Sequence, residues 1–265
     1  MDVVKYECSG GVATITLNRP ESLNSMTDEF MRGIIAAFEK VEADESVRVV
    51  VLTGEGRGFC SGADLSEAAE PGDPSQATDE MGGSFNPAIL AVTNCPVPTV
   101  GRINGVAAGG GFGLALACDI SIAARSAFFV ATFGPRLGIV PDLGTTWHLT
   151  MRVGPARARG IAMLGGRITA DEAADLGLIW QAVDDDDLDA AVAEVTDLFQ
   201  RTSPDAMTRI RSTIADAERN TLAEQLDLEM HHQAVLIPAN MTEAAAAFME
   251  KREPTFSPAR EVPRR

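Results

Sequence analysis

The sequence predicts an α/β fold with a core of repeated strand and helix units and a tail made only of helices. Residues 47–52 and 97–103 are short apolar runs rich in β-branched side chains, a pattern typical of buried strands. From Leu188 onward, apolar residues recur only at helical spacing. We therefore place the core at residues 1–195 and a helical region at residues 196–265, which suits a chain of 265 residues.

The first unit of the core begins with a predicted β-hairpin. Residues 3–7 and 12–17 are its expected strands, and the two glycines between them form the turn. Thr27 is the expected N-cap of the following helix, because two acidic residues and then apolar residues at helical spacing come after it. The strand at 47–52 completes the unit. Residues 97–123 are expected to form a second, similar unit, with a strand at 97–103, the glycine-rich helix and a strand at 119–123.

After the second unit the sequence predicts mainly helices. One helix starts at Asp142 or just after it, and a short one starts at Thr169 and ends near Gly177. Pro204 and Pro238 are expected to interrupt the helical tail. The other predicted helices span residues 155–165, 188–201, 204–218, 221–236 and 241–252. Residues 66–88, rich in polar residues, glycine and proline, predict a loop with room for one short helix.

Composition excludes several classes of function. The net charge of −16 argues against a nucleic-acid partner. The four cysteines have neither metal-site nor disulfide spacing and are interpreted as reduced thiols of a cytoplasmic protein. We expect no signal peptide and no membrane span, because no apolar run is long enough.

Two glycine-rich stretches carry the functional signal. Residues 104–119 follow one predicted strand, and residues 58–65 follow another. Glycine lets a backbone approach a ligand closely, and the start of a helix leaves N–H groups unpaired, which suits an oxyanion. One N–H from each stretch could converge on a single carbonyl oxygen. Neither stretch matches a dinucleotide-binding or P-loop pattern.

The motifs FCSGADL and INGVAAGGGFGLALACDI resemble the crotonase (enoyl-CoA hydratase/isomerase) superfamily, and the resemblance extends over nearly the whole chain. It implies a spiral of ββα units, an acyl-CoA substrate and a helical tail that assembles homotrimers or hexamers. No metal, flavin or nicotinamide is implied, because coenzyme A is part of the substrate. By position, the oxyanion donors would be the backbone N–H groups of Ser61 and Gly110. The coenzyme A and substrate contacts would be Ser22, Leu23, Ala63, Asp64, Leu65, Phe248 and Lys251, the last two from a neighbouring subunit.

The sequence departs from the family where hydratases carry two glutamates that activate water. Those positions are Gly113 and Gly134 here, and glycine has no acid–base group. One carboxylate remains, at Asp142, and two interpretations of it are open: a helix N-cap with Thr145 at the third position, or a catalytic group. The segments VPDLGTTW and GLIWQAVDDDDL are similar to ring 1,2-epoxyphenylacetyl-CoA isomerases of bacterial phenylacetate degradation and to 3,2-enoyl-CoA isomerases. In those enzymes a carboxylate at this position shuttles the proton.

The preferred hypothesis is therefore an isomerase that moves a double bond in an acyl-CoA or rearranges a ring epoxide. One base suffices for a 1,3-proton shift, because it can take a proton at one carbon and return it at another. The alternatives are a hydratase with atypical residues, a dehalogenase with Asp142 as nucleophile, or a non-catalytic acyl-CoA-binding protein. Trp147 and His148, on the helix after Asp142, are interpreted as packing residues.

Overall fold

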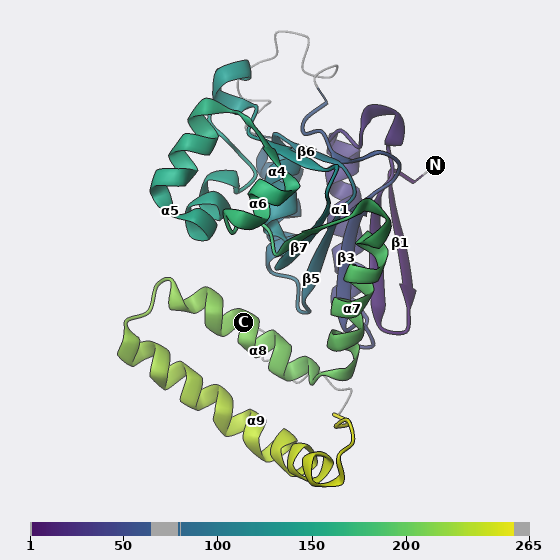
Figure 1. Ribbon diagram of the computed structural model, residues 1–265, viewed down its shortest axis with the longest axis vertical. Coiled ribbons are helices and arrows are strands. Elements are labelled where there is room, and N and C mark those ends of the chain that lie inside the picture. Colours follow the sequence, from purple (N-terminus) through teal and green to yellow (C-terminus); the bar gives the residue numbers. More distant parts are fainter. Residues whose placement is uncertain (1, 65–78, 80, 257–265) are drawn as a thin grey trace.

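Two sheets form the centre of the molecule, and helices surround them (Figure 1). The computed structural model describes residues 2–64, 79 and 81–256. The larger sheet has the strand order β1-β2-β3-β5-β7-β10, and the smaller has the order β4-β6-β8-β9. Apart from the antiparallel pairs at one edge of each sheet, β1 with β2 and β8 with β9, the strands run parallel. The α/β prediction is confirmed.

The first unit follows the predicted order of strand, strand, helix and strand. The hairpin consists of β1 (Val4–Ser9) and β2 (Val12–Leu17), and β3 (Val49–Gly54) pairs with β2 after α1 (Asp28–Ala43). Thr27 caps α1, since its side chain accepts a hydrogen bond from Phe30 N at 3.2 Å. Alternate residues of β2 are buried, so one face of this strand packs into the core.

The second unit supplies the middle of both sheets. The larger sheet continues with β5 and β7, and the glycine-rich stretch between these strands forms β6 and α4. All eight residues of α4 are buried, which requires small or apolar side chains around the whole helix. The bounds are β4 (Gly58–Cys60), α3 (Asn86–Thr93), β5 (Thr99–Ile103), β6 (Val106–Ala108), α4 (Gly110–Ala117), β7 (Ile120–Ala124), β8 (Phe128–Val130) and β9 (Arg167–Thr169).

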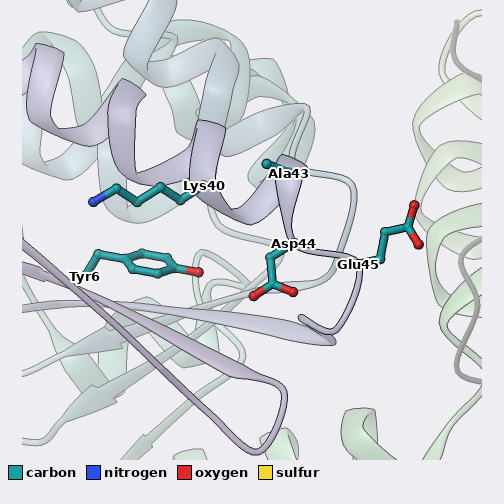
Figure 2. A pocket seen from close by; sticks show the side chains of 5 residues that line it. All are labelled: Tyr6, Lys40, Ala43, Asp44 and Glu45. Atoms are coloured by element: carbon teal, nitrogen blue, oxygen red, sulfur yellow. The ribbon is translucent and has the colours of Figure 1, made fainter.

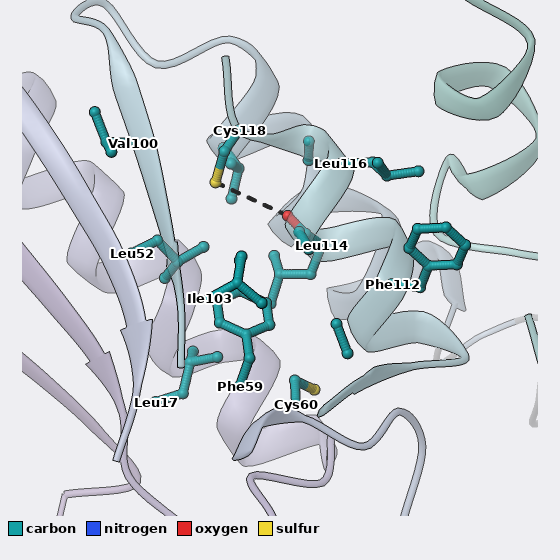
Figure 3. Close-up of a cluster of buried hydrophobic side chains, with 14 of the residues drawn as sticks. Leu17, Leu52, Phe59, Cys60, Val100, Ile103, Phe112, Leu114, Leu116 and Cys118 are labelled. Atoms are coloured by element: carbon teal, nitrogen blue, oxygen red, sulfur yellow. Dashed lines mark hydrogen bonds between the residues drawn. The ribbon is translucent and has the colours of Figure 1, made fainter. Parts of the chain in front are cut away.

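The core lies between α4 and the larger sheet. Figure 3 shows Leu114 of α4 on the side of the helix that faces Leu52 of β3 and Ile103 of β5. Each of these three residues is completely buried. Burial of such a continuous apolar cluster fixes the position of α4, and with it the glycines at the start of the helix.

The remaining elements are mainly helical, as predicted, but one boundary was wrong. The helix expected just after Asp142 and the one expected at 155–165 are both confirmed: they are the two helical pieces of α5 (Thr145–Leu164), which meet at a kink where Gly154 has a non-helical backbone. The two tail helices expected around Pro238 are one helix, α9 (Leu222–Glu250), which contains this proline in its interior. The other elements are α6 (Ala170–Asp175), β10 (Gln181–Val183), α7 (Leu188–Arg201) and α8 (Pro204–Ala217), with short helical turns at Pro20–Ser22, Met81–Phe85, Phe133–Leu137 and Asp185–Asp187.

The tail forms a pair of antiparallel helices, α8 and α9, that lies beside the core (Figure 1). Arg211 of α8 joins it to the core, with its Nε donating to both carboxylate oxygens of Asp119 at 2.7 Å. The predicted division at residues 195 and 196 falls within α7 and stays a prediction. No helix in the described part of the chain is long and apolar enough to cross a membrane.

Candidate active site

The fold brings the two glycine-rich stretches into contact. Strands β4 and β6 pair in parallel, so the segments that follow them leave the small sheet side by side. A Cβ atom added to Gly62 would lie 2.8 Å from Ala108 O and 3.2 Å from Gly110 N. Gly62 also has a φ of +92°, which side chains rarely adopt. Only glycine therefore allows this approach of the two backbones.

The N–H of Ser61, one of the two predicted oxyanion donors, is already engaged. It donates to Leu23 O at 3.0 Å, and the Ser61 hydroxyl donates to Ser22 O at 3.1 Å. Because this amide is paired within the chain, it is not free to bind a ligand oxygen. The structure thus counts against the predicted role of Ser61, and it gives Ser22 and Leu23 a structural role in holding the 58–64 segment.

The amide of Ala63 is better placed. Met26 and Ala63 form a parallel bridge, in which Met26 N donates to Gly62 O at 2.8 Å and Asp64 N donates to Met26 O at 2.9 Å. Ala63 lies between the two residues that bond to Met26, so its own N–H points away from Met26. The sequence predicted only a substrate contact for Ala63. The direction of its N–H depends on the pairing with Met26, and no local sequence pattern shows that pairing.

Gly110 is the first residue of α4, so its N–H has no acceptor one turn earlier in the helix. The eight-residue helix also places its positive dipole end at this amide. The N–H of Gly110 and that of Ala63 therefore come from the two segments that touch at Gly62. This pair of groups is what an oxyanion hole requires.

Asp142 lies on a tight turn and does not cap α5. The helix starts at Thr145, its N-cap is Gly144, and no side chain accepts a capping hydrogen bond there. The cap interpretation was wrong because Leu143 and Gly144 both have left-handed backbones, with φ of +50° and +70°, which separate Asp142 from the helix. A non-glycine residue such as Leu143 in this region is strained, and such strain concentrates at functional sites.

The Asp142 turn packs on the start of α4. A Cβ atom added to Gly110 would lie 2.5 Å from Leu143 Cδ1. One added to Gly113 would lie 2.6 Å from Thr145 Oγ1 and 2.7 Å from Leu143 O. Position 113 therefore has no carboxylate and no room for one, because Leu143 and Thr145 of the Asp142 turn occupy the space that a side chain would need. At Gly134, in contrast, an added Cβ would meet only Ala162 O at 3.5 Å, an ordinary contact.

The surroundings of Asp142 suit proton transfer. Its side chain is partly buried, and this desolvation raises the pKa of the carboxyl above its ordinary value. His148 lies one turn into α5 and is buried, and burial together with the Arg152 charge lowers its pKa to about 4. The imidazole is therefore neutral at neutral pH, which leaves Asp142 as the acid–base group of this turn.

The raised pKa predicts that Asp142→Asn stabilises the fold at neutral pH. A carboxyl with a raised pKa favours the folded state most at low pH, and this contribution is lost as the pH rises through the folded pKa. Asparagine does not ionise, so the variant avoids that loss. Urea unfolding at pH 7 and pH 4 should show a more stable variant at pH 7 and a smaller difference at pH 4. A variant less stable than the wild type at pH 7 would contradict the burial argument.

The packing interpretation holds for His148 but not for Trp147. His148 is 7% exposed, whereas Trp147 is 47% exposed, with its ring edge-on to the imidazole at 4.9 Å between centres. Phe248 is 82% exposed near the end of α9, and Lys251 follows that helix. Figure 1 shows the end of α9 on the opposite side of the molecule from α4, so one protomer does not bring these residues to the site. Leu65 lies outside the described residues.

An open depression elsewhere in the molecule does not share these features. Figure 2 shows it at the end of α1, where Lys40 Nζ lies 5.3 Å from the centre of the Tyr6 ring. Neither glycine stretch contributes to its lining, which consists of Tyr6, Lys40, Ala43, Asp44 and Glu45. Among residues 2–64, 79 and 81–256, no group of three His, Cys, Asp or Glu side chains is placed to hold a metal ion.

Comparisons with known proteins agree with this architecture. The family described as Enoyl-CoA hydratase/isomerase matches residues 7–259. The 1,2-epoxyphenylacetyl-CoA isomerase of Escherichia coli K12 is 42% identical over 263 residues, covering 97% of this chain and 99% of that protein. A probable enoyl-CoA hydratase of Rhodobacter capsulatus is 39% identical, covering 96% of this chain and 97% of its own. The crystal structure of an enoyl-CoA hydratase from Polaromonas superposes with a TM-score of 0.90 at 32% identity, covering 96% and 99% of the two chains. The chain belongs to the enoyl-CoA hydratase/isomerase family, the crotonase superfamily.

Proposed function

We propose that the protein is an acyl-CoA isomerase that converts a 3-enoyl-CoA to the 2-enoyl isomer, with Asp142 as its single proton shuttle. The observation that carries this proposal is the Asp142 turn packed over Gly110 and Gly113. Leu143 and Thr145 of this turn fill the space where a hydratase glutamate would stand, and the turn carries one carboxyl, that of Asp142, whose pKa is raised by burial. The site thus has one acid–base group and two backbone donors.

In the proposed reaction the thioester carbonyl binds to the N–H groups of Ala63 and Gly110. Asp142 removes a proton from the carbon next to the thioester, and the electron pair moves into a dienolate whose charge rests on the carbonyl oxygen. The protonated Asp142 then returns a proton to the γ-carbon, and the double bond settles beside the carbonyl. Donors fixed before the reaction stabilise the dienolate, each contributing roughly 3–4 kcal/mol in related acyl chemistry.

Ionised Asp142 starts this cycle and neutral Asp142 completes it. A pKa raised by burial brings the two forms closer in free energy at neutral pH, which helps one group act as base and then as acid. Water addition needs a second group to activate water, and neither Gly113 nor Gly134 supplies one. Isomerisation therefore fits the residues better than hydration.

A second candidate substrate is a ring-epoxide acyl-CoA. The Escherichia coli relative is named as an isomerase of 1,2-epoxyphenylacetyl-CoA, and its match covers the chain almost from end to end. The same oxyanion donors and the same carboxyl would serve a rearrangement of that ring. We propose this as the alternative activity, and with it a place in the degradation of phenylacetate-like compounds.

We also propose that the protein works as a homotrimer or a dimer of trimers. Helix α9 exposes several large apolar side chains, including Met230, Ile237 and Met241, each more than half exposed. Phe248 and Lys251 could then reach the coenzyme A of a neighbouring subunit. A cytoplasmic location fits the four cysteines, which are all free thiols.

The experiment that tests the proposed function supplies a 3-enoyl-CoA and, in parallel, a 2-enoyl-CoA, and separates the products by chromatography. The proposal predicts interconversion of the two isomers with little 3-hydroxyacyl-CoA. Predominant formation of 3-hydroxyacyl-CoA would favour the hydratase alternative. Binding of both compounds without any product, including from a ring-epoxide acyl-CoA, would leave a non-catalytic acyl-CoA-binding protein.

A further inference from the structure

We propose that Arg19 and Asp64 are positioning residues that hold the Ala63 N–H in the direction the oxyanion hole needs. This inference rests on the proposed acyl-CoA site but not on the isomerase reaction itself. Asp64 directly follows Ala63, and Arg19 reaches it from a distant part of the sequence. The ion pair therefore joins the first strand–helix connection to the peptide that presents the donor.

Arg19, Ser25 and Asp64 form a ring of hydrogen bonds. Arg19 Nη2 and Ser25 Oγ each donate to Asp64 Oδ2 at 2.9 Å. Arg19 Nη1 donates to Ser25 O at 2.6 Å and to Ser25 Oγ at 3.1 Å. The carboxylate is thus held by a guanidinium and a hydroxyl that also hold each other. Such charge-assisted bonds are stronger and more directional than neutral ones.

This network lies beside a backbone ladder that fixes the same segment. Met26 pairs with the residues on both sides of Ala63, through Gly62 O and Asp64 N. Asn24 is completely buried, and its side chain donates to Gly58 O at 2.8 Å and to Glu55 O at 3.0 Å. Rotation of the Ala63 peptide would have to break bonds on both sides.

Burial distinguishes this ion pair from those of the surface. The side chains of Arg19 and Asp64 are 20% and 14% exposed. Most other ion pairs of the described chain have a partner that is at least 40% exposed, such as Lys5 with Glu55 at 45% and 46%. A partly buried pair is screened less by solvent and holds its geometry better.

The pair also has an electrostatic role. The reaction develops negative charge on the thioester oxygen, close to the Ala63 peptide and thus near the Asp64 carboxylate. An unpaired carboxylate there would oppose that charge, and the Arg19 guanidinium neutralises it. Loss of Arg19 should therefore be more harmful than loss of both charges together.

The test uses Arg19→Met, Asp64→Asn and the double variant, with the full-length protein. The matched control is Arg211→Met, which removes the pair with Asp119, 19% and 28% exposed, on the tail side of the core. Infrared difference spectra of bound butyryl-CoA, labelled with ¹³C at the carbonyl, report the strength of the oxyanion hydrogen bonds. Steady-state assays with a 3-enoyl-CoA substrate measure turnover and KM for the same proteins.

We expect the carbonyl band of Arg19→Met to move back toward its frequency in free butyryl-CoA, with turnover about 10–100-fold slower and KM little changed. The double variant should recover part of that loss, and Arg211→Met should leave the band unchanged. An unchanged band in both single variants, with the fold intact, would overturn the inference. So would an unshifted band in the wild type, because no donor would then hold the carbonyl.

Two further results keep the inference separate from the proposed function. A shifted wild-type band without turnover of the 3-enoyl-CoA would refute the isomerase proposal and leave the positioning role to be judged from the band alone. If Arg19→Met does not fold, Ser25→Ala removes one bond to Asp64 and keeps the ion pair. It should shift the band in the same direction by a smaller amount, and no shift would count against the network.

Discussion

Asp142→Asn should slow the isomerisation of an enoyl-CoA substrate by about 10²- to 10⁴-fold at saturation, the usual contribution of a positioned acid–base group. Asparagine keeps the size and hydrogen-bonding capacity of the side chain but cannot take up a proton. The KM should change little, because the oxyanion donors belong to the backbone of other residues. Steady-state assays of the purified variant measure both the turnover number and the KM.

A matched control for this experiment is Asp186→Asn, which removes one exposed carboxylate on the short turn before α7. This control should have wild-type activity. If Asp142→Asn also retains wild-type turnover while folding as the same oligomer, the proton shuttle lies elsewhere and Asp142 has only a structural role. Equal losses in both variants would point to a general effect of surface charge.

Gly113→Glu should destabilise the fold by at least about 3 kcal/mol, because overpacking and an unpaired buried charge act at one position. The new Cβ would overlap Leu143 O and Thr145 Oγ1, and the carboxylate would enter a fully buried helix. Either the Asp142 turn moves away or the helix shifts, so isomerase activity should be lost as well. Urea unfolding measures the change in free energy.

Gly134→Glu is the matched control, since it introduces the same side chain at the other hydratase position. Gly134 is exposed, and its added Cβ meets a single atom at 3.5 Å, so its stability should stay within about 0.5 kcal/mol of the wild type. Equal stability of the two variants would show that the Asp142 turn yields easily. In that case steric exclusion would not explain the absence of a glutamate at position 113.

The alternation of strands and helices was predictable because it depends on local periodicity. The β-branched runs at β3 and β5 and the Thr27 cap occur where the sequence indicates them. The single helix α9 was not predictable, because Pro238 is a strong local signal and the structure tolerates it. Helix interruptions depend on tertiary contacts as well as on the residue.

The candidate site was predictable at the level of segments but not of atoms. The glycine stretches indicated where two backbones meet, and the contact of Gly62 with Gly110 agrees with that. Which amide faces the ligand depends on the pairing of Met26 with Ala63, which no local pattern encodes. The same holds for Asp142, because its separation from α5 comes from the left-handed backbone of Leu143.

Deuterium tracing tests the central proposal, that Asp142 forms and reprotonates the dienolate. A 3-enoyl-CoA with deuterium on the carbon next to the thioester is incubated with wild type and with Asp142→Asn, and the label is located by NMR. We predict that the wild type yields 2-enoyl-CoA with part of the label at the γ-carbon, and that the variant neither forms product nor loses label. Loss of label at the wild-type rate in the folded variant would contradict the account, because another group would then be the base.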